Sequence, residues 1–329
     1  MSAPVGIAMA LIVTAASIYS FSPRHVPPLK ETRIPVDRMQ LTTIERSKAG
    51  VVAAGELGSI LVSPDDGKTW KRASLSNERQ ALITRITFAD ELHGIALGHE
   101  GWILRTEDGG LNWQEAHFDE SNGEPLMAAR RLPSGDWLAV GAFGQVLRSS
   151  DDGKSWQPET IPNLTDWHLN DIASSADGRQ WLIVGESGTA LRSSDGGNTW
   201  EAVAPFYKGS LYGAASLGDG HWVAYGMRGN VFSSADGGAT WEAATVPAPV
   251  SIYGHALQAD GELLLVGQGG IALSSTDGGK SFNVVRRGGR ASLTDIVVKQ
   301  DGSWLLSSDG GLQVQSAPTA QPTRKDGAA

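Results

Sequence analysis

The sequence contains no cysteine and no excess of positive charge. Without cysteine the chain cannot form disulfides, use a thiol in catalysis or hold a metal through thiolates. Its 27 Lys and Arg residues against 36 Asp and Glu residues give a formal net charge of −9 at pH 7. Because nucleic-acid binders need a basic surface to neutralise phosphates, this balance argues against DNA or RNA as a partner.

What the chain has in abundance is glycine, with 41 residues, and tryptophan, with 11. Many turn-forming residues together with large flat side chains are typical of an all-β fold. Hydrophobic residues make up 40% of the 329 residues, which is enough for a substantial core.

The two ends of the chain differ from the rest. Val5 to Phe21 is uncharged and mostly apolar, and a Pro-containing stretch follows it. This pattern predicts that residues 1–22 are a signal peptide or an N-terminal membrane anchor and that residues 23–31 are a linker. A buried N-terminal helix is the alternative. Residues 316–329 are rich in Pro, Thr and Ala, which predicts a disordered tail.

An eight-residue motif, Ser/Thr-x-Asp-x-Gly-x-x-Trp/Phe, occurs six times, and we call it the box. The closing aromatic residues fall 43, 43, 44, 41 and 41 residues apart, about one four-stranded propeller blade each. The aspartates of the six boxes are Asp65, Asp108, Asp151, Asp195, Asp236 and Asp277.

A Gly-x-x-Gly motif lies upstream of each box, from Gly55–Gly58 to Gly267–Gly270. Between apolar runs it predicts a hairpin whose two-residue turn has glycine at its edges. A seventh copy, within Leu293 to Gln315, lacks the box and the fourth strand. We therefore predict that residues 32–315 form an all-β, seven-bladed β-propeller of four-stranded antiparallel blades. We also predict that Arg33 to Val36 supplies the outer strand of the last blade, since an open sheet edge is a liability.

The box itself suggests a structural role. Its Asp can accept hydrogen bonds from backbone N–H groups one or two residues further on, and its Gly allows a tight turn. A calcium loop would need more oxygen ligands than the box offers, so we predict no metal and no cofactor. Another series sits at one repeat position and predicts packing between blades, with a sugar-stacking platform as the alternative: Trp137, Trp181, Trp222 and Trp304.

The fuller repeat runs from Asp-Gly through Trp and Gly-x-x-Gly to the box, as in Asp177 to Trp200 and Asp219 to Trp241. Over about residues 40 to 315 it resembles the photosystem II stability and assembly factor family. That resemblance implies an exported or lumenal propeller without catalytic activity that holds newly made membrane subunits during assembly. It also implies a location in the periplasm, or in the thylakoid lumen of a photosynthetic source.

The box also resembles the BNR repeat of sialidases, and Arg33-Ile34-Pro35 resembles the Arg-Ile-Pro that precedes their first box. The alternative is therefore a sialidase-like glycoside hydrolase or a carbohydrate-binding propeller. The chain departs from sialidases in its uniform blades and in lacking a Tyr/Glu pair on corresponding strands. Tyr212 and Tyr253 share one repeat position, which we interpret as packing.

In a propeller, the turns between second and third strands and the links between blades emerge on one face, and the boxes emerge on the other. Variable loops on a rigid scaffold are the usual place for recognition, and aromatic and Arg residues dominate interfaces. The predicted partner-binding residues are Phe143, Trp167, His168, Phe206, Tyr207, Met227, Arg228, Arg286 and Arg287. The alternative is that some of them cap the ends of blades.

Three arginines that precede boxes, Arg105, Arg148 and Arg192, form either a basic stripe or ion pairs with neighbouring blades. The function that we predict is an exported, non-catalytic, monomeric scaffold. It binds a protein partner such as a membrane complex under assembly, and touches the membrane only through its N-terminal segment if that is retained.

Overall fold

The computed structural model describes residues 3–21, 34–119, 123–162 and 164–316. The chain divides into two compact units, Met1–Ile34 and Pro35–Ala329. The first unit contains the helix α1 (Ala3–Phe21). Across the described residues, no helix combines the length and the apolar character that a membrane span requires.

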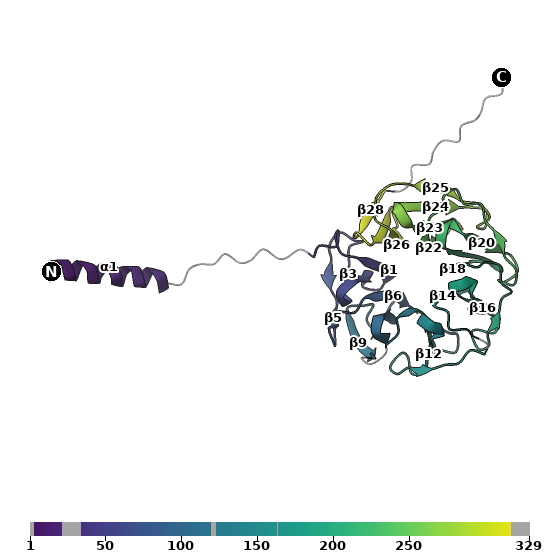
Figure 1. Ribbon diagram of the computed structural model, residues 1–329, viewed down its shortest axis with the longest axis horizontal. Helices are drawn as coiled ribbons and strands as arrows, with labels where there is room; N and C mark the ends of the chain where they lie inside the picture. The colour runs from purple at the N-terminus through teal and green to yellow at the C-terminus, as the bar shows by residue number, and fades with distance from the viewer. Residues whose placement is uncertain (1–2, 22–33, 120–122, 163, 317–329) are drawn as a thin grey trace, which may run out of the picture. The chain divides into compact units, whose positions relative to one another are not determined.

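The second unit is a ring of seven antiparallel sheets within the described residues, which confirms the predicted propeller (Figure 1). Blade 1 consists of β1 (Leu41–Ser47), β2 (Gly50–Gly55), β3 (Ile60–Ser63) and β4 (Lys71–Arg72). Blade 2 consists of β6 (Ile83–Phe88), β7 (Gly94–Gly98), β8 (Ile103–Thr106) and β9 (Asn112–His117). A short strand from the preceding link, β5 (Ser74–Leu75), adds to blade 2 by pairing in parallel with β9.

The remaining blades follow in chain order. Blade 3 consists of β10 (Leu126–Arg131), β11 (Trp137–Gly141), β12 (Val146–Ser149) and β13 (Gln157–Pro158). Blade 4 consists of β14 (Leu169–Ser174), β15 (Trp181–Gly185), β16 (Ala190–Ser193) and β17 (Glu201–Ala202). Blade 5 consists of β18 (Leu211–Gly218), β19 (His221–Gly226), β20 (Val231–Ser234) and β21 (Glu242–Ala243). Blade 6 consists of β22 (Ile252–Leu257), β23 (Leu263–Gly267), β24 (Ile271–Ser275) and β25 (Asn283–Arg286). Blade 7 consists of β26 (Leu293–Val298), β27 (Trp304–Ser308) and β28 (Gln313–Gln315).

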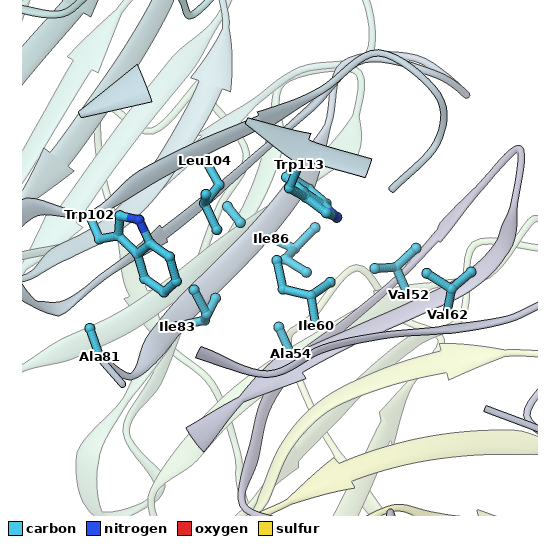
Figure 2. Close-up of a cluster of buried hydrophobic side chains, with 11 residues drawn as sticks. Val52, Ala54, Ile60, Val62, Ala81, Ile83, Ile86, Trp102, Leu104 and Trp113 are labelled. Carbon is cyan, nitrogen blue, oxygen red and sulfur yellow. The ribbon is translucent and has the colours of Figure 1, made fainter. Parts of the chain in front are cut away.

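The hydrophobic core is divided into clusters that lie between neighbouring blades. In the cluster of Figure 2, Val52 and Ile60 of blade 1 pack with Ile86, Trp102 and Trp113 of blade 2. The second strand of each blade is almost entirely buried on both faces in this way, and its residues are therefore mostly apolar. The recurring tryptophans at position 137 and its equivalents are buried in these clusters, which confirms inter-blade packing and leaves them unable to stack on a sugar.

The expected fourth strand of blade 7 is absent from the described residues, which corrects the prediction of ring closure. Ile34 is not part of a strand, and Arg33 lies outside the described residues. A single backbone bond remains, in which the N–H of Leu312 donates to the carbonyl of Val36 at 2.7 Å. The chain turns away here because residues 36–38 form a turn rather than an extended segment.

Blade 7 instead joins blade 1 through its innermost strand. The hydroxyl of Thr294 donates to the carbonyl of Leu41 at 2.7 Å, and the carboxylate of Asp295 accepts from the N–H of Ile44 at 3.2 Å. Val297 and Leu305 of blade 7 pack with Ile44 and the other apolar residues of blade 1. Lateral packing, rather than a shared sheet, therefore closes the ring.

The boxes form tight turns between the third and fourth strands, as the fourth box shows. Oδ1 of Asp195 accepts from the N–H groups of Asn198 and Thr199 at 3.1 and 2.9 Å, and Oδ2 accepts from the Thr199 hydroxyl at 2.7 Å. The Ser193 hydroxyl donates to Oδ1 and accepts from the N–H of Gly197. The donors therefore lie three and four residues on, not one or two as expected, because the intervening residues form the loop itself.

Candidate functional site

The turns between second and third strands have one geometry in all six regular blades. At the first, the N–H of Ser59 donates to the carbonyl of Glu56 at 3.0 Å, and Leu57 and Gly58 have φ of 53° and 65°. Two left-handed central residues define a type I′ hairpin turn. The centre of the turn is thus one residue later than expected and includes the second glycine of the motif. The same turn occupies Glu56–Gly58, His99–Gly101, Ala142–Gly144, Glu186–Gly188, Met227–Gly229 and Gln268–Gly270.

A residue other than glycine occupies the first left-handed position in five of these turns. The five are Leu57, Glu100, Phe143, Ser187 and Arg228, with φ between 51° and 60°. This conformation is uncommon for residues that carry a Cβ and costs of the order of 1 kcal/mol at each position. The turns therefore hold these side chains outward against the preference of their own backbone.

The links between blades lie against these turns. The N–H of Gly144 donates to the carbonyl of Trp167 at 2.9 Å, and the N–H of Gly188 donates to that of Gly209 at 2.7 Å. Turns and links consequently share one surface, as predicted, and we call it the turn–link face. The turns between first and second strands and the boxes lie on the opposite face, which we call the box face.

Phe143, Trp167 and His168 come together on the turn–link face where blades 3 and 4 meet. Phe143 is 58% exposed and Trp167 is 46% exposed. The rings of Phe143 and His168 lie 4.7 Å apart between centroids. His168 Nε2 lies 3.8 Å from the carboxylate of Glu186. The structure therefore groups three of the predicted residues into one aromatic patch with an acidic neighbour.

Phe206 and Tyr207 are only partly exposed, which corrects the expectation that they stand free. Phe206 stacks on Trp241 with centroids 5.1 Å apart and meets Phe232 edge-on at 5.1 Å. The ring of Tyr207 also contacts Phe232, at 5.2 Å, and burial raises the pKa of its phenol. These two side chains fill the junction of blades 4 and 5, because the neighbouring blade offers them an aromatic surface.

Met227, Arg228 and Arg287 differ in their surroundings. The sulfur of Met227 accepts a hydrogen bond from the N–H of Ser210 at 3.4 Å. This residue therefore connects its turn in blade 5 to the link between blades 4 and 5. Arg228, at the tip of its turn, and Arg287, in the link between blades 6 and 7, are exposed. These two remain accessible to a partner.

Arg286 is engaged inside the fold. Its guanidinium donates to Gln313 at 2.7 Å, to Gln315 at 3.2 Å and to the carbonyl of Gly270. This favours the alternative that some of the predicted residues cap the ends of blades.

The three arginines that precede boxes form ion pairs rather than a free basic stripe. Arg148 lies 3.1 Å from Asp136 and contacts Glu159, and Arg192 lies 3.2 Å from Glu201. Arg105 contacts Glu107. The acids belong to the same blade as each arginine, not to the neighbouring blade as expected. Glu159 and Glu201 lie at the fourth strand beside the arginine's own strand, Glu107 lies in the box, and Asp136 lies in the turn before the second strand.

One feature of the turn–link face was not predicted from the sequence, and one prediction about it is confirmed. Leu57 is 65% exposed at the tip of the blade 1 turn and lines a groove of about 650 Å³ with Pro35, Met39 and Leu75. Its place in the turn motif was the signal that could have identified it. Tyr212 and Tyr253 pack on each other with centroids 5.5 Å apart, as their shared repeat position indicated.

The largest group of residues that was not predicted from the sequence is a polar belt formed by the innermost strands and by Tyr225 of β19. The hydroxyl of Tyr225 lies 2.7 Å from Nδ1 of His255, and Arg85 lies 3.9 Å from Asp295. Arg130 lies 3.9 Å from Glu45. These groups occupy irregular positions of an otherwise apolar repeat, and their alignment across blades is the signal that could have revealed them.

Enclosure inside the ring shifts the pKa values of this belt. Burial raises the pKa of Glu45 from 4.5 to about 7, although Arg130 acts in the opposite direction. Burial likewise raises the pKa of Asp295 and lowers that of His255 from 6.5 to about 4. At neutral pH, His255 is therefore uncharged and Glu45 is only partly ionised.

The box carboxylates are saturated by donors of their own loops. The hydroxyl of Thr199, followed by its N–H, lowers the pKa of Asp195 from 3.8 to about 2. The same arrangement lowers the pKa of Asp65, Asp151 and Asp236 to about 2. Among the described residues, no three His, Cys, Asp or Glu side chains gather as in a metal site.

Comparisons with known proteins agree with this architecture. A family model described as Photosynthesis system II assembly factor YCF48 matches residues 30–107 and 78–158, which span the first three blades. No curated protein sequence matches the chain.

Solved structures resemble the chain in fold at low sequence identity. "YCF48 bound to D1 peptide" has a TM-score of 0.69 at 17% identity and covers 90% of this chain and 97% of its own. "YCF48 from Cyanidioschyzon merolae" has a TM-score of 0.66 at 17% identity, with 89% and 99% covered. A streptogramin B lyase has a TM-score of 0.70 at 14% identity, with 87% and 96% covered.

The fold and the repeated boxes define the class of protein: the chain is a seven-bladed β-propeller whose boxes resemble the BNR repeat. Within that class it is similar to the Photosynthesis system II assembly factor YCF48, by family model over its first three blades and by fold over the whole ring.

Proposed function

We propose that this chain is an exported, non-catalytic and monomeric propeller that binds a protein partner through its turn–link face. The partner that we infer is a membrane protein or complex during its assembly. The similarity to the YCF48 assembly factor supports this proposal, because a similar structure is described as bound to a peptide. Export rests on the apolar segment Val5 to Phe21, which suits a signal peptide or anchor.

The observation that carries the proposal is the exposed pair Phe143 and Trp167. Both rings are accessible at the junction of two rigid blades, and Phe143 is held outward by a left-handed backbone. Large aromatic side chains with few rotatable bonds are typical anchors of protein interfaces, worth about 2 kcal/mol or more each. Such residues are costly to expose without a partner, so their presence on one face favours recognition there.

The box face offers a matched comparison. Leu111, in the second box, is 50% exposed, and it is also a large apolar residue held on a rigid turn. The box turns repeat one hydrogen-bonded arrangement from blade to blade, and so they provide little individuality for recognition. Replacing Leu111 by a small polar residue therefore removes exposed apolar area from the box face, which makes it a control for substitutions on the turn–link face.

The experiment compares two full-length variants with the wild type. Phe143→Asn combined with Trp167→Ser removes the aromatic pair, and Asn tolerates the left-handed backbone. Leu111→Ser is the control. Each protein is cross-linked in membranes of the source, and the captured partner is identified by mass spectrometry.

We expect one membrane protein to be captured by the wild type and by Leu111→Ser, and to be lost from the double variant. Loss from Leu111→Ser with retention by the double variant would place the interface on the box face. Hydrolysis of a sialoside by the purified protein, abolished by Arg33→Ala, would overturn the non-catalytic part of the proposal. Arg33 itself lies outside the described residues.

A further inference from the structure

A cavity of about 550 Å³ opens on the box face at the centre of the ring. Residues of five blades line it, from Thr87 of blade 2 to His255 of blade 6. The turn between first and second strands of blade 3, at Leu132 and Pro133, forms part of its rim. The cavity is therefore separate from the turn–link face.

The cavity exists because the fifth residue of the innermost strand is small in consecutive blades. Blades 1 to 3 place Glu45, Thr87 and Arg130 at this position. Blades 4 and 5 place Ala173 and Ala215 there, and both alanines line the cavity. Blades 2 and 3 thus contribute Thr87 and Arg130 to the lining. Blades 4 and 5 contribute only small side chains at this level, the alanines together with Ser174, Ser175 and Ser216.

The charged residues that line the cavity are all positive. Arg130 and Arg131 line the cavity, and none of the described residues that line it is Asp or Glu. This stands out in a chain with a formal net charge of −9. His255 adds a ring that is uncharged at neutral pH, because burial lowers its pKa to about 4.

The nearby carboxylates are occupied elsewhere. Asp171 accepts from the N–H of Ala214 at 3.1 Å, and Asp295 accepts from the N–H groups of Ile44 and Ile296 and lies near Arg85. Glu45 accepts from the N–H of Phe88 at 3.0 Å.

Arg130 has only partial compensation. It donates to the hydroxyl of Thr87, and its nearest carboxylate, Glu45, is 3.9 Å away. Because Glu45 is partly protonated at neutral pH, it neutralises this guanidinium incompletely. Arg131, at the rim, lies 3.3 Å from Asp152 of the third box.

We propose that this cavity binds a small organic carboxylate, with the anion on Arg130 and the apolar body against the wall formed by Ala173 and Ala215. A guanidinium presents parallel N–H donors that match the two oxygens of a carboxylate. The hydroxyl of Thr87 accepts a hydrogen bond from Arg130 and so helps to hold its guanidinium in place, and Arg131 adds a second positive charge that attracts anions. Small-molecule sites commonly place a few convergent polar groups beside apolar side chains, and this cavity has both.

Benzoate is the probe, and calorimetric titration of the full chain is the measurement. Benzamide has the same shape without the charge, and sulfate has charge without an apolar body. We expect saturable binding of benzoate, with benzamide and sulfate weaker by at least about tenfold, as the loss of a charge-assisted pair or of the apolar contact implies. Equal binding of benzoate and benzamide, equal binding of sulfate, or no binding of benzoate would overturn the proposal.

Three variants locate the site. Arg130→Gln removes the cation, and Ala215→Val fills the cavity with a side chain that blade 7 already carries at the equivalent position, Val297. Both variants should bind benzoate with an affinity that is lower by about tenfold or more. The control is Arg192→Gln, which changes a surface arginine that is paired with Glu201. Equal loss in the control, or unchanged affinity in Ala215→Val, would place the ligand elsewhere even if Arg130→Gln failed to fold.

Binding should also take up protons. A carboxylate beside Arg130 adds negative charge near Glu45, which raises the pKa of that side chain further. Near pH 7, titrations in buffers of different ionisation enthalpy should therefore show proton uptake that disappears in Glu45→Gln. Proton release, or uptake that persists in this variant, would contradict the assigned position of the anion.

Discussion

Arg286 of β25 donates from Nη2 to the side-chain oxygen of Gln313 in β28, at 2.7 Å. The same guanidinium reaches Gln315 and the carbonyl of Gly270, so one side chain links blade 6 to the outermost described strand of blade 7. Blade 7 lacks a fourth strand among the described residues, so β28 has no further strand to pair with on its outer side. The contacts from Arg286 of the neighbouring blade hold β28 instead.

Replacing Arg286 by Met should lower the free energy of unfolding by about 1–3 kcal/mol, because charge-assisted hydrogen bonds between the last two blades are lost. Denaturant unfolding measures the change, and hydrogen exchange should show faster opening of residues 313–315 first. The adjacent Arg287 is exposed and serves as the control, since Arg287→Met should leave both quantities unchanged. Equal stability of the two variants would show that Arg286 does not hold the blade.

The fold could be predicted because its signals are local and repeated. Each box places Asp, Gly and an aromatic residue in one turn, and the spacing of the boxes gives the blade. Closure of the ring could not be predicted in the same way. It depends on Thr294 and Asp295 reaching β1 across some 250 residues of sequence, a relationship that no local pattern encodes.

The turn–link face and the exposure of Phe143 and Trp167 on it could be predicted from the sequence, whereas their role in binding a partner stays a prediction. Phe143 and Trp167 are exposed, as loop aromatics at the ends of a rigid scaffold suggest. Phe206 was misjudged because its exposure depends on Trp241 of the following blade. Arg130 was missed because the cavity arises from small residues in other blades, and only the assembled ring brings them opposite each other.

Asp195→Ala should lower the free energy of unfolding by about 1–2 kcal/mol, because the N–H groups of Asn198 and Thr199 lose their acceptor. Binding of a partner on the opposite face should persist. Asp166→Ala, which removes an exposed carboxylate outside the boxes, is the control. A chelator should leave the Tm of the wild type unchanged, and a clear decrease with EDTA would indicate a calcium site in the boxes after all.

Acid should destabilise the propeller through its boxes. The folded-state pKa of Asp65, Asp151, Asp195 and Asp236 is about 2, below the ordinary 3.8. A depressed pKa contributes stability that is present above about pH 4 and is lost as the pH falls toward 2. Unfolding free energies measured across this window should decline less steeply in Asp195→Asn than in the wild type. An identical slope would show that this box does not contribute.

Glu45 should act in the opposite direction at higher pH. Its folded-state pKa is raised from 4.5 to about 7, so the folded state holds the proton more tightly and loses stability as the pH rises between these values. Arg130, Arg85 and Asp295 are the charged groups that face it. Glu45→Gln should therefore gain about 1–2 kcal/mol relative to the wild type between pH 5 and pH 8. Stability differences that do not vary with pH would exclude this titration.

The variant Phe143→Gly tests whether the left-handed turn residues are used to bind the partner. Its φ of 51° favours glycine, so Phe143→Gly should raise the free energy of unfolding by up to about 1 kcal/mol, less the small ring contact with His168. The same variant should bind the partner more weakly by at least about tenfold, because an exposed aromatic anchor is removed.

Glu100 provides the matched control for this prediction. It occupies the same position of the turn in blade 2, with φ of 60°, and carries no apolar side chain. Glu100→Gly should stabilise the fold similarly and leave partner binding intact. If both variants are stabilised and both still bind, the left-handed residue of blade 3 is a feature of the repeat and the interface lies elsewhere. A gain in stability coupled to a loss of binding at Phe143 alone would show that this turn maintains an unfavourable backbone in order to present its ring.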